Sequence, residues 1–182
     1  MDIMQISTAH WHLLVNHFPI ILSIMGTLFL ILNLVFKKSN LNNAAFLLLI
    51  IGAITAIIAN QTGEGAEEMV EEIAGVSHQG IHKHEDAAAI GLKIILVTGI
   101  LAACTGIAKL KFPKAAKFML IATFVGALAS SGYMSYVGLT GGEIRHSEIR
   151  GEINIGSSKT TPANKATEQR SGEAGEDAEE DD

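Results

Sequence analysis

The sequence predicts an all-α membrane protein: a bundle of four transmembrane helices followed by a polar C-terminal tail. Hydrophobic residues make up 48% of the 182 residues, and nearly all of them lie in four long blocks. In the segment 156–182 the only such residues are four alanines, and the rest are mainly Ser, Thr, Gly and charged residues. A membrane domain with a polar appendage explains this segregation better than a soluble globular core does.

The four apolar blocks are each long enough to cross a bilayer, which requires about 20 mostly apolar residues. They are also too long for strands, and their polarity does not alternate. The first ten residues contain neither Lys nor Arg, so we expect the first helix to be retained rather than cleaved as a signal peptide. We place a transmembrane domain at residues 1–140, with spans at about 13–36, 41–60, 87–108 and 118–139.

The basic residues near the span ends predict the orientation. Lys37 and Lys38 follow the first span, and the loop after the third contains four lysines from Lys109 to Lys117. None of the 19 Asp and Glu residues lies in either loop. The positive-inside rule therefore puts both loops in the cytoplasm of a bacterial cell. The N-terminus, the segment 61–86 and the C-terminus then lie on the periplasmic side of the inner membrane.

The segment 61–86 connects the second and third spans on the outer side. Thr62 and Gly63 are expected to end the second span and to begin a short amphipathic helix across the outer mouth of the bundle. Its apolar residues recur at helical spacing and its glutamates lie on the opposite face. The glutamates would be either a solvated acidic face or ligands turned towards a metal or a histidine cluster.

The chain beyond the fourth span should leave the membrane domain. The pair Gly141 and Gly142 is expected to end the helix, and residues 141–155 to form a short extended periplasmic segment. The acidic tail, residues 156–182, cannot bury a core and is expected to be disordered.

The histidines provide the functional signal, because the expected topology places all seven in the outer leaflet or outside it. His17 lies inside the first span, and Pro19 removes a backbone hydrogen bond to the Val15 carbonyl, so a kink is expected there. An ionisable side chain within a span is costly and suggests a functional site. The seven are His10, His12, His17, His78, His82, His84 and His146.

Three functions fit this pattern. In the first, His17 and His84 ligate a b-type haem in a redox subunit that exchanges electrons with a periplasmic or membrane partner. In the second, mixed ligands hold a zinc, copper or iron ion, the candidates being His12, His17, His84, Glu64, Glu67 and Glu68. In the third, the histidines bond to carboxylates in a non-catalytic scaffold whose acidic tail recruits a partner.

Other functions have less support in the sequence. The chain offers no basic face for nucleic acid and no nucleophile motif for hydrolysis. Polar groups are sparse in the inner halves of the spans, which disfavours transport. The lipid bilayer is the one partner that composition indicates. Whether the chain is an enzyme, and whether it forms an oligomer, stay open.

Several short elements resemble a bacterial family of membrane proteins known as domain of unknown function 2231. The resemblance begins with His12, continues with His17 in the element His-Phe-Pro-Ile, and covers roughly residues 10–150. Thr62-Gly63-Glu64-Gly65-Ala66, His84 and Gly141-Gly142 also match. The family often has a later His-Gly, whereas Ser147 follows His146 here, so the role of His146 does not carry over. The resemblance implies a four-helix membrane fold and no activity, although some relatives accompany redox modules.

Overall fold

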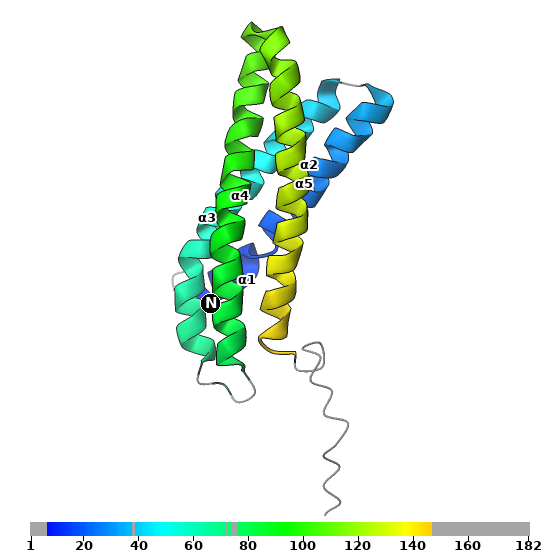
Figure 1. Ribbon diagram of the computed structural model, residues 1–182. Helices are drawn as coiled ribbons and strands as arrows, with labels where there is room; N and C mark the ends of the chain where they lie inside the picture. Colours follow the sequence, from blue (N-terminus) through cyan, green and yellow to red (C-terminus); the bar gives the residue numbers. More distant parts are fainter. Residues whose placement is uncertain (1–6, 38, 72, 74–75, 147–182) are drawn as a thin grey trace, which may run out of the picture.

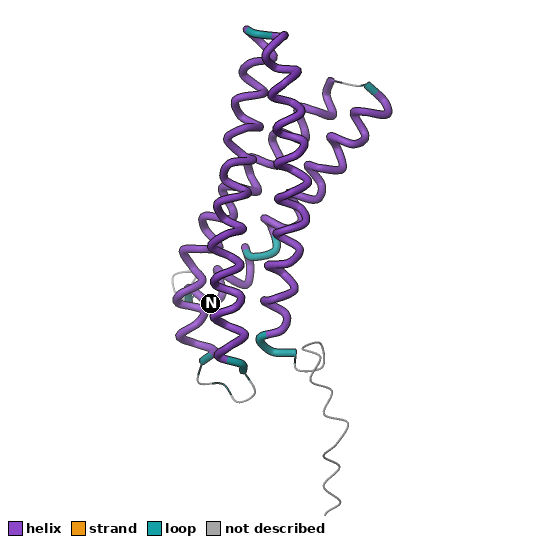
Figure 2. The backbone as a smooth tube through the Cα atoms, in the orientation of Figure 1, coloured by secondary structure: helices purple, strands orange, loops and turns teal. Residues whose placement is uncertain are grey.

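A computed structural model describes residues 7–37, 39–71, 73 and 76–146 (Figure 1). Figure 2 shows that the described chain consists of helices joined by short loops, without a strand. The expected all-α class is therefore confirmed. Residues 147–182, which include most of the expected extended segment and the whole acidic tail, lie outside the described part. The helices are α1 (Thr8–Val15), α2 (Phe18–Phe36), α3 (Ser39–Val70), α4 (His78–Lys111) and α5 (Pro113–Glu143).

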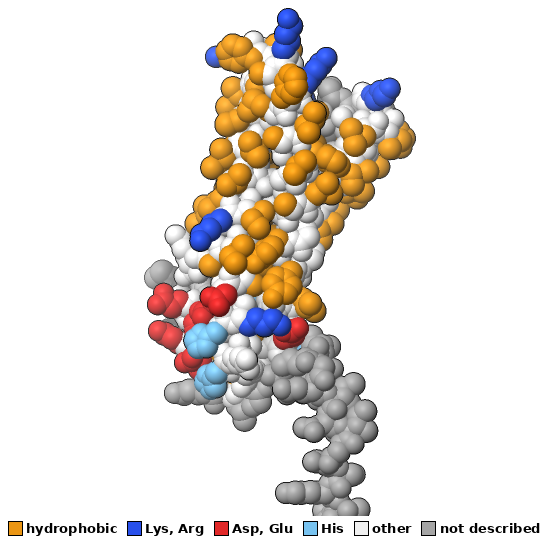
Figure 3. All heavy atoms as spheres, in the orientation of Figure 1, with side chains coloured by type: hydrophobic (Ala, Val, Ile, Leu, Met, Phe, Trp, Pro, Cys, Tyr) orange, Lys and Arg blue, Asp and Glu red, His pale blue; other side chains and the backbone are white. Residues whose placement is uncertain are grey.

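The expected four transmembrane segments are confirmed as helices long and apolar enough to cross a membrane. The first consists of α1 and α2 together, and α3, α4 and α5 provide the other three. Their outward faces carry large exposed apolar side chains, for example Leu34, Ile100 and Ile121, each about 60% exposed. Figure 3 shows these side chains as a broad hydrophobic band between the two charged ends of the molecule. Such a band is what hydrocarbon requires, since lipid tails are as apolar as the side chains that face them.

Small residues bring the long helices close together. Successive long helices run in opposite directions, and α4 and α5 lie side by side along their length (Figure 1). Gly99 of α4 faces α3, where an added Cβ would lie only 2.6 Å from the Cβ of Ala53. Gly126 of α5 faces α4, and a Cβ there would lie 2.8 Å from the Thr98 hydroxyl oxygen. Glycine therefore permits the close backbone approach that drives helix association in membranes.

Buried hydroxyl pairs join the same helices inside the apolar core. Thr105 of α4 and Thr123 of α5 have their hydroxyl oxygens 2.8 Å apart, and both side chains are fully buried. Further along the same interface, Ser130 donates to the Thr98 hydroxyl over 2.9 Å. These bonds satisfy polar groups that would otherwise be costly in a medium without water.

The first transmembrane segment is interrupted at Asn16–His17, where we expect a kink. The amide of Asn16 still donates to the His12 carbonyl over 2.9 Å, and α2 restarts at Phe18. Pro19 lies in the first turn of α2 and has no N–H to donate back to the Val15 carbonyl. The structure therefore agrees with the effect expected of the proline.

Two helix ends differ from the sequence-based expectation. α3 does not break at Gly63 but continues to Val70, so the separate amphipathic helix expected in 61–86 is wrong for residues 61–70. The Thr62 hydroxyl donates to the Ile58 carbonyl within the helix, so Thr62 is accommodated there without ending it. Likewise α5 continues through Gly141 and Gly142 to Glu143.

Because of these extensions, the helices reach beyond the hydrocarbon. α3 has 32 residues, and at 1.5 Å per residue it is about 48 Å long, compared with about 30 Å for the bilayer core. The part of α3 after Asn60 carries the glutamates and therefore lies outside the apolar layer. We call this end of the molecule, formed by 61–70 of α3, the first two turns of α4 and the last turn of α5, the acidic end. Figure 3 shows acidic and histidine side chains gathered there and lysines at the opposite end.

Candidate metal centre

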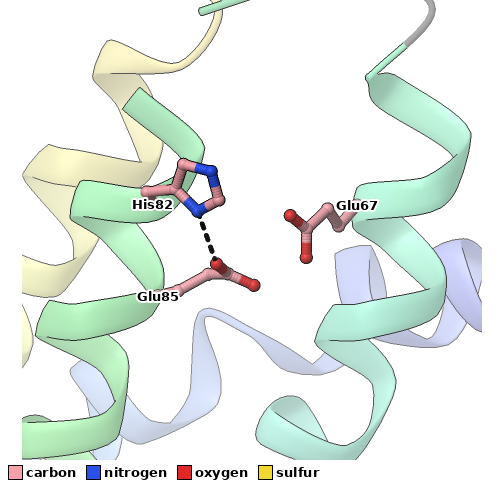
Figure 4. Close-up of side chains that lie close together, drawn as sticks. All are labelled: Glu67, His82 and Glu85. Carbon is pink, nitrogen blue, oxygen red and sulfur yellow. Dashed lines mark hydrogen bonds and ion pairs between the residues drawn. The ribbon is translucent and has the colours of Figure 1, made fainter. Parts of the chain in front are cut away.

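The acidic end brings the last turns of α3 against the first turns of α4. Ser77 caps α4, because its side-chain oxygen accepts a hydrogen bond from the Gly80 amide over 3.1 Å. Lys83 donates to Glu143 over 2.6 Å and so joins α4 to the end of α5. Glu67 belongs to α3 and lies opposite the first turns of α4 (Figure 4).

Glu67, His82 and Glu85 form a compact group at this junction. Each offers one ligand atom, and the three atoms all lie within 4.8 Å of one another. His82 Nδ1 and Glu85 Oε2 are 3.3 Å apart, and the two residues are one helical turn from each other on α4. Figure 4 shows the Glu67 side chain pointing across from α3 towards this pair. We call these three residues the Glu67 cluster.

The electrostatics of the Glu67 cluster favour a cation. The pKa of the Glu67 carboxyl is raised from 4.5 to about 6, chiefly because its side chain shares a hydrogen bond with that of Glu85. Partial burial and the negative charges of Glu85 and Glu71 raise this pKa further, while His82 lowers it. Two carboxylates held this close repel each other unless a proton or a metal ion lies between them.

His12 and His84 are half-buried between helices near the same end. The Nδ1–H of His12 donates to the Ala59 carbonyl of α3 over 2.9 Å. The Nδ1–H of His84 donates to the Val137 carbonyl of α5 over 3.1 Å. Each imidazole also packs beside a glycine, since a Cβ added at Gly63 or Gly141 would lie 3.7 or 3.1 Å from the Cε1 of His12 or His84.

Of the residues that the sequence predicts as ligands, the structure places Glu67 in the cluster and leaves His17, Glu64 and Glu68 outside it. His17 is exposed at the start of α2, and within the described chain the hydrogen bonds of His84 go to Val137 and Thr140 of α5 and not to His17. Glu64 and Glu68 are exposed on α3, whereas Glu67 faces α4. Placing His17 with His84 on a haem therefore stays a prediction.

His82 and Glu85 are two candidate ligands that sequence reasoning missed. Their spacing of three residues in an acidic and histidine-rich helix start was the available signal. The prediction that the second span ends at Gly63 does not relate this signal to Glu67. A broken α3 would not have held Glu67 opposite the first turns of α4.

Comparison with known proteins identifies the kind of protein but no activity. A family model described as "Predicted membrane protein (DUF2231)" matches residues 10–148, well over half of the chain. No curated protein and no solved structure matches the chain.

Proposed function

The chain belongs to the DUF2231 family of membrane proteins, and from this premise we propose that it binds a divalent transition-metal ion at the Glu67 cluster. One observation carries the proposal: ligand atoms from two helices converge within 4.8 Å. The proposal places the acidic end on the periplasmic side of a bacterial inner membrane, because the lysine-rich loops lie at the other end.

The chemistry of the cluster suits zinc or iron(II). Imidazole and carboxylate are common ligands of both ions, and two carboxylates balance a charge of +2. Three protein ligands leave one tetrahedral position open for water or for a ligand from outside. The exposed side chains of His82 and Glu85 make this position accessible from the aqueous side.

Zinc titration of the purified full-length protein in mild detergent tests the proposal. We expect one Zn²⁺ per chain at this site, measured by competition with a chromophoric chelator. His82→Asn should weaken binding by about 100-fold, because losing even an indirect metal contact costs 10–100-fold.

His78→Asn is the matched control, since His78 is also exposed and lies one turn away, 3.9 Å from Glu71. It should bind zinc as the wild type does. If the wild type binds no zinc, or if His82→Asn binds it equally well, the proposal is wrong.

Zinc affinity should also depend on pH in a defined direction. Because the pKa of Glu67 is raised to about 6, its carboxyl holds a proton below that pH, and zinc must displace it. The apparent affinity is therefore expected to rise from pH 5 to pH 7 and to level off above. The same titration at several pH values measures this, and an affinity independent of pH between 5 and 7 would contradict the assignment of Glu67.

The visible spectrum of the same sample separates the alternatives. A Soret band after dithionite reduction, lost in His17→Ala or His84→Ala, would indicate a b-type haem and a redox function. A folded sample that binds neither haem nor metal would favour a scaffold with hydrogen-bonded histidines.

A further inference from the structure

A pocket lies at the lysine-rich end of the molecule, where α2 ends and α3 begins. It has a volume of about 360 Å³ and is lined by Asn33, Leu34, Lys37 and Asn42. The Glu67 cluster is at the opposite end and shares none of these residues (Figure 3). We propose that this α2–α3 pocket binds the head group of an anionic phospholipid that also carries hydroxyls, such as phosphatidylglycerol.

The buried side chain of Asn42 points to a polar ligand. Asn42 is only 7% exposed, and its side-chain oxygen, Oδ1, has no hydrogen-bond partner among the described residues. No hydrogen bond of its amide nitrogen is found among them either. Buried polar groups without a partner are rare in proteins and call for a specific explanation. A carboxamide can donate to a phosphate oxygen and accept from a hydroxyl, so it suits a head group that offers both.

The charges around the α2–α3 pocket favour an anion. Lys37 lines the pocket, and its ammonium makes no ion pair or hydrogen bond within the part of the chain that the structure describes. Asn42 lies in the first turn of α3, where free amides and the helix dipole also attract negative charge. None of the 19 Asp and Glu residues lies in the two loops at this end. A zwitterionic head group would therefore bring its ammonium close to a lysine without a carboxylate to balance it.

The surroundings of the pocket favour a lipid over a free phosphate ion. Leu34 forms one wall, and Leu34 and its neighbour Val35 are 61% and 67% exposed. The pocket therefore adjoins the apolar surface that faces hydrocarbon, where the acyl chains of a phospholipid lie. In the orientation proposed above, this end lies in the cytoplasmic leaflet, and basic pockets between helices on that side bind anionic head groups.

Lipid titration of the delipidated full-length protein in mild detergent tests the pocket, and native mass spectrometry resolves each bound lipid. The first phosphatidylglycerol is expected to bind about fivefold more tightly than phosphatidylethanolamine, because one lysine beside an anionic head group contributes a factor of about five. Lys37→Asn should abolish this preference. Asparagine removes the charge and tolerates the left-handed backbone at this position, where φ is 51°.

Two further variants separate a specific site from general attraction. Asn42→Leu keeps the approximate size of the side chain and should weaken phosphatidylglycerol binding about fivefold, as expected for one lost hydrogen bond. Lys114→Asn is the matched control, because Lys114 is exposed in the first turn of α5 and does not line the pocket. It removes the same charge from the same end and should retain the preference for phosphatidylglycerol.

Equal affinity of the wild type for the two lipids would overturn the proposal. So would a preference that survives in Lys37→Asn, or one that is lost equally in Lys114→Asn. An excess of inorganic phosphate should leave phosphatidylglycerol bound, and displacement would show that the pocket takes a free phosphate ion instead. If Asn42→Leu does not fold, Lys37→Asn still decides the question, since Lys37 is exposed at the end of a helix. Zinc binding involves none of these residues, so either proposal can fail alone.

Discussion

Glu67→Gln is expected to lower zinc affinity by about 100-fold, as much as the loss expected for His82→Asn. The substitution keeps the size of the side chain and removes the charge that balances Zn²⁺ from the α3 side. Because Glu67 is the only member of the cluster on α3, its loss leaves two ligands, His82 and Glu85, both from one helix. Competition with a chromophoric chelator at pH 7 measures the change.

Glu68→Gln and Glu64→Gln provide matched controls for this experiment. Both remove one negative charge from the same part of α3, but both residues are exposed and neither belongs to the cluster. They should retain affinity within about threefold, because exposed charges are screened by solvent and salt. If all three variants lose zinc equally, binding depends on general negative charge and not on the geometry of the cluster.

Gly99→Val is expected to have the largest effect on stability. A Cβ at this position would lie 2.6 Å from Ala53 Cβ, and both atoms are fixed to helix backbones. The helices must therefore separate, and overpacking of this kind costs about 1–3 kcal/mol. Unfolding of the protein in detergent, followed by circular dichroism, measures the loss.

Gly132→Val separates this steric effect from the effect of valine itself. Gly132 is also in the interior of a long helix, but an added Cβ there has no atom within 4 Å. Gly132→Val should therefore leave stability nearly unchanged or raise it slightly, because glycine is a poor helix former. Equal destabilisation by both substitutions would show that helix separation at Gly99 is not the cause.

The membrane fold could be predicted from the sequence because it depends on long apolar blocks. The interruption at Asn16–His17 also followed from a local cause, the missing N–H of Pro19. The extent of α3 could not be predicted, because Thr62 and Gly63 are poor helix formers locally. In the structure the Thr62 hydroxyl donates to the Ile58 carbonyl within α3, and Gly63 packs beside the His12 ring of α1. Tertiary contacts outweigh such local preferences.

The candidate site was predicted less well for the same reason. Glu67 could be named as one of several glutamates, and His12 and His84 as members of a histidine-rich region. Which of these side chains lie close together depends on the rotation of each helix about its axis and on the residue at which α3 ends. Residue spacing alone determines neither of these two features. His82 and Glu85 were overlooked because their partner lies fifteen or more residues away on another helix.

The glycines in the outer part of α3 restrict which sequences this fold can accept. Gly63 lies beside the His12 ring, and a side chain at Gly65 would collide with Thr8, so both positions form the surface on which α1 rests. Glu64 and Glu68, on the exposed side of the same turns, have no such constraint. In a library of random substitutions over 61–70, we therefore expect tolerance to alternate along the helix. Positions facing α1 should retain glycine, while their exposed neighbours should accept most polar residues.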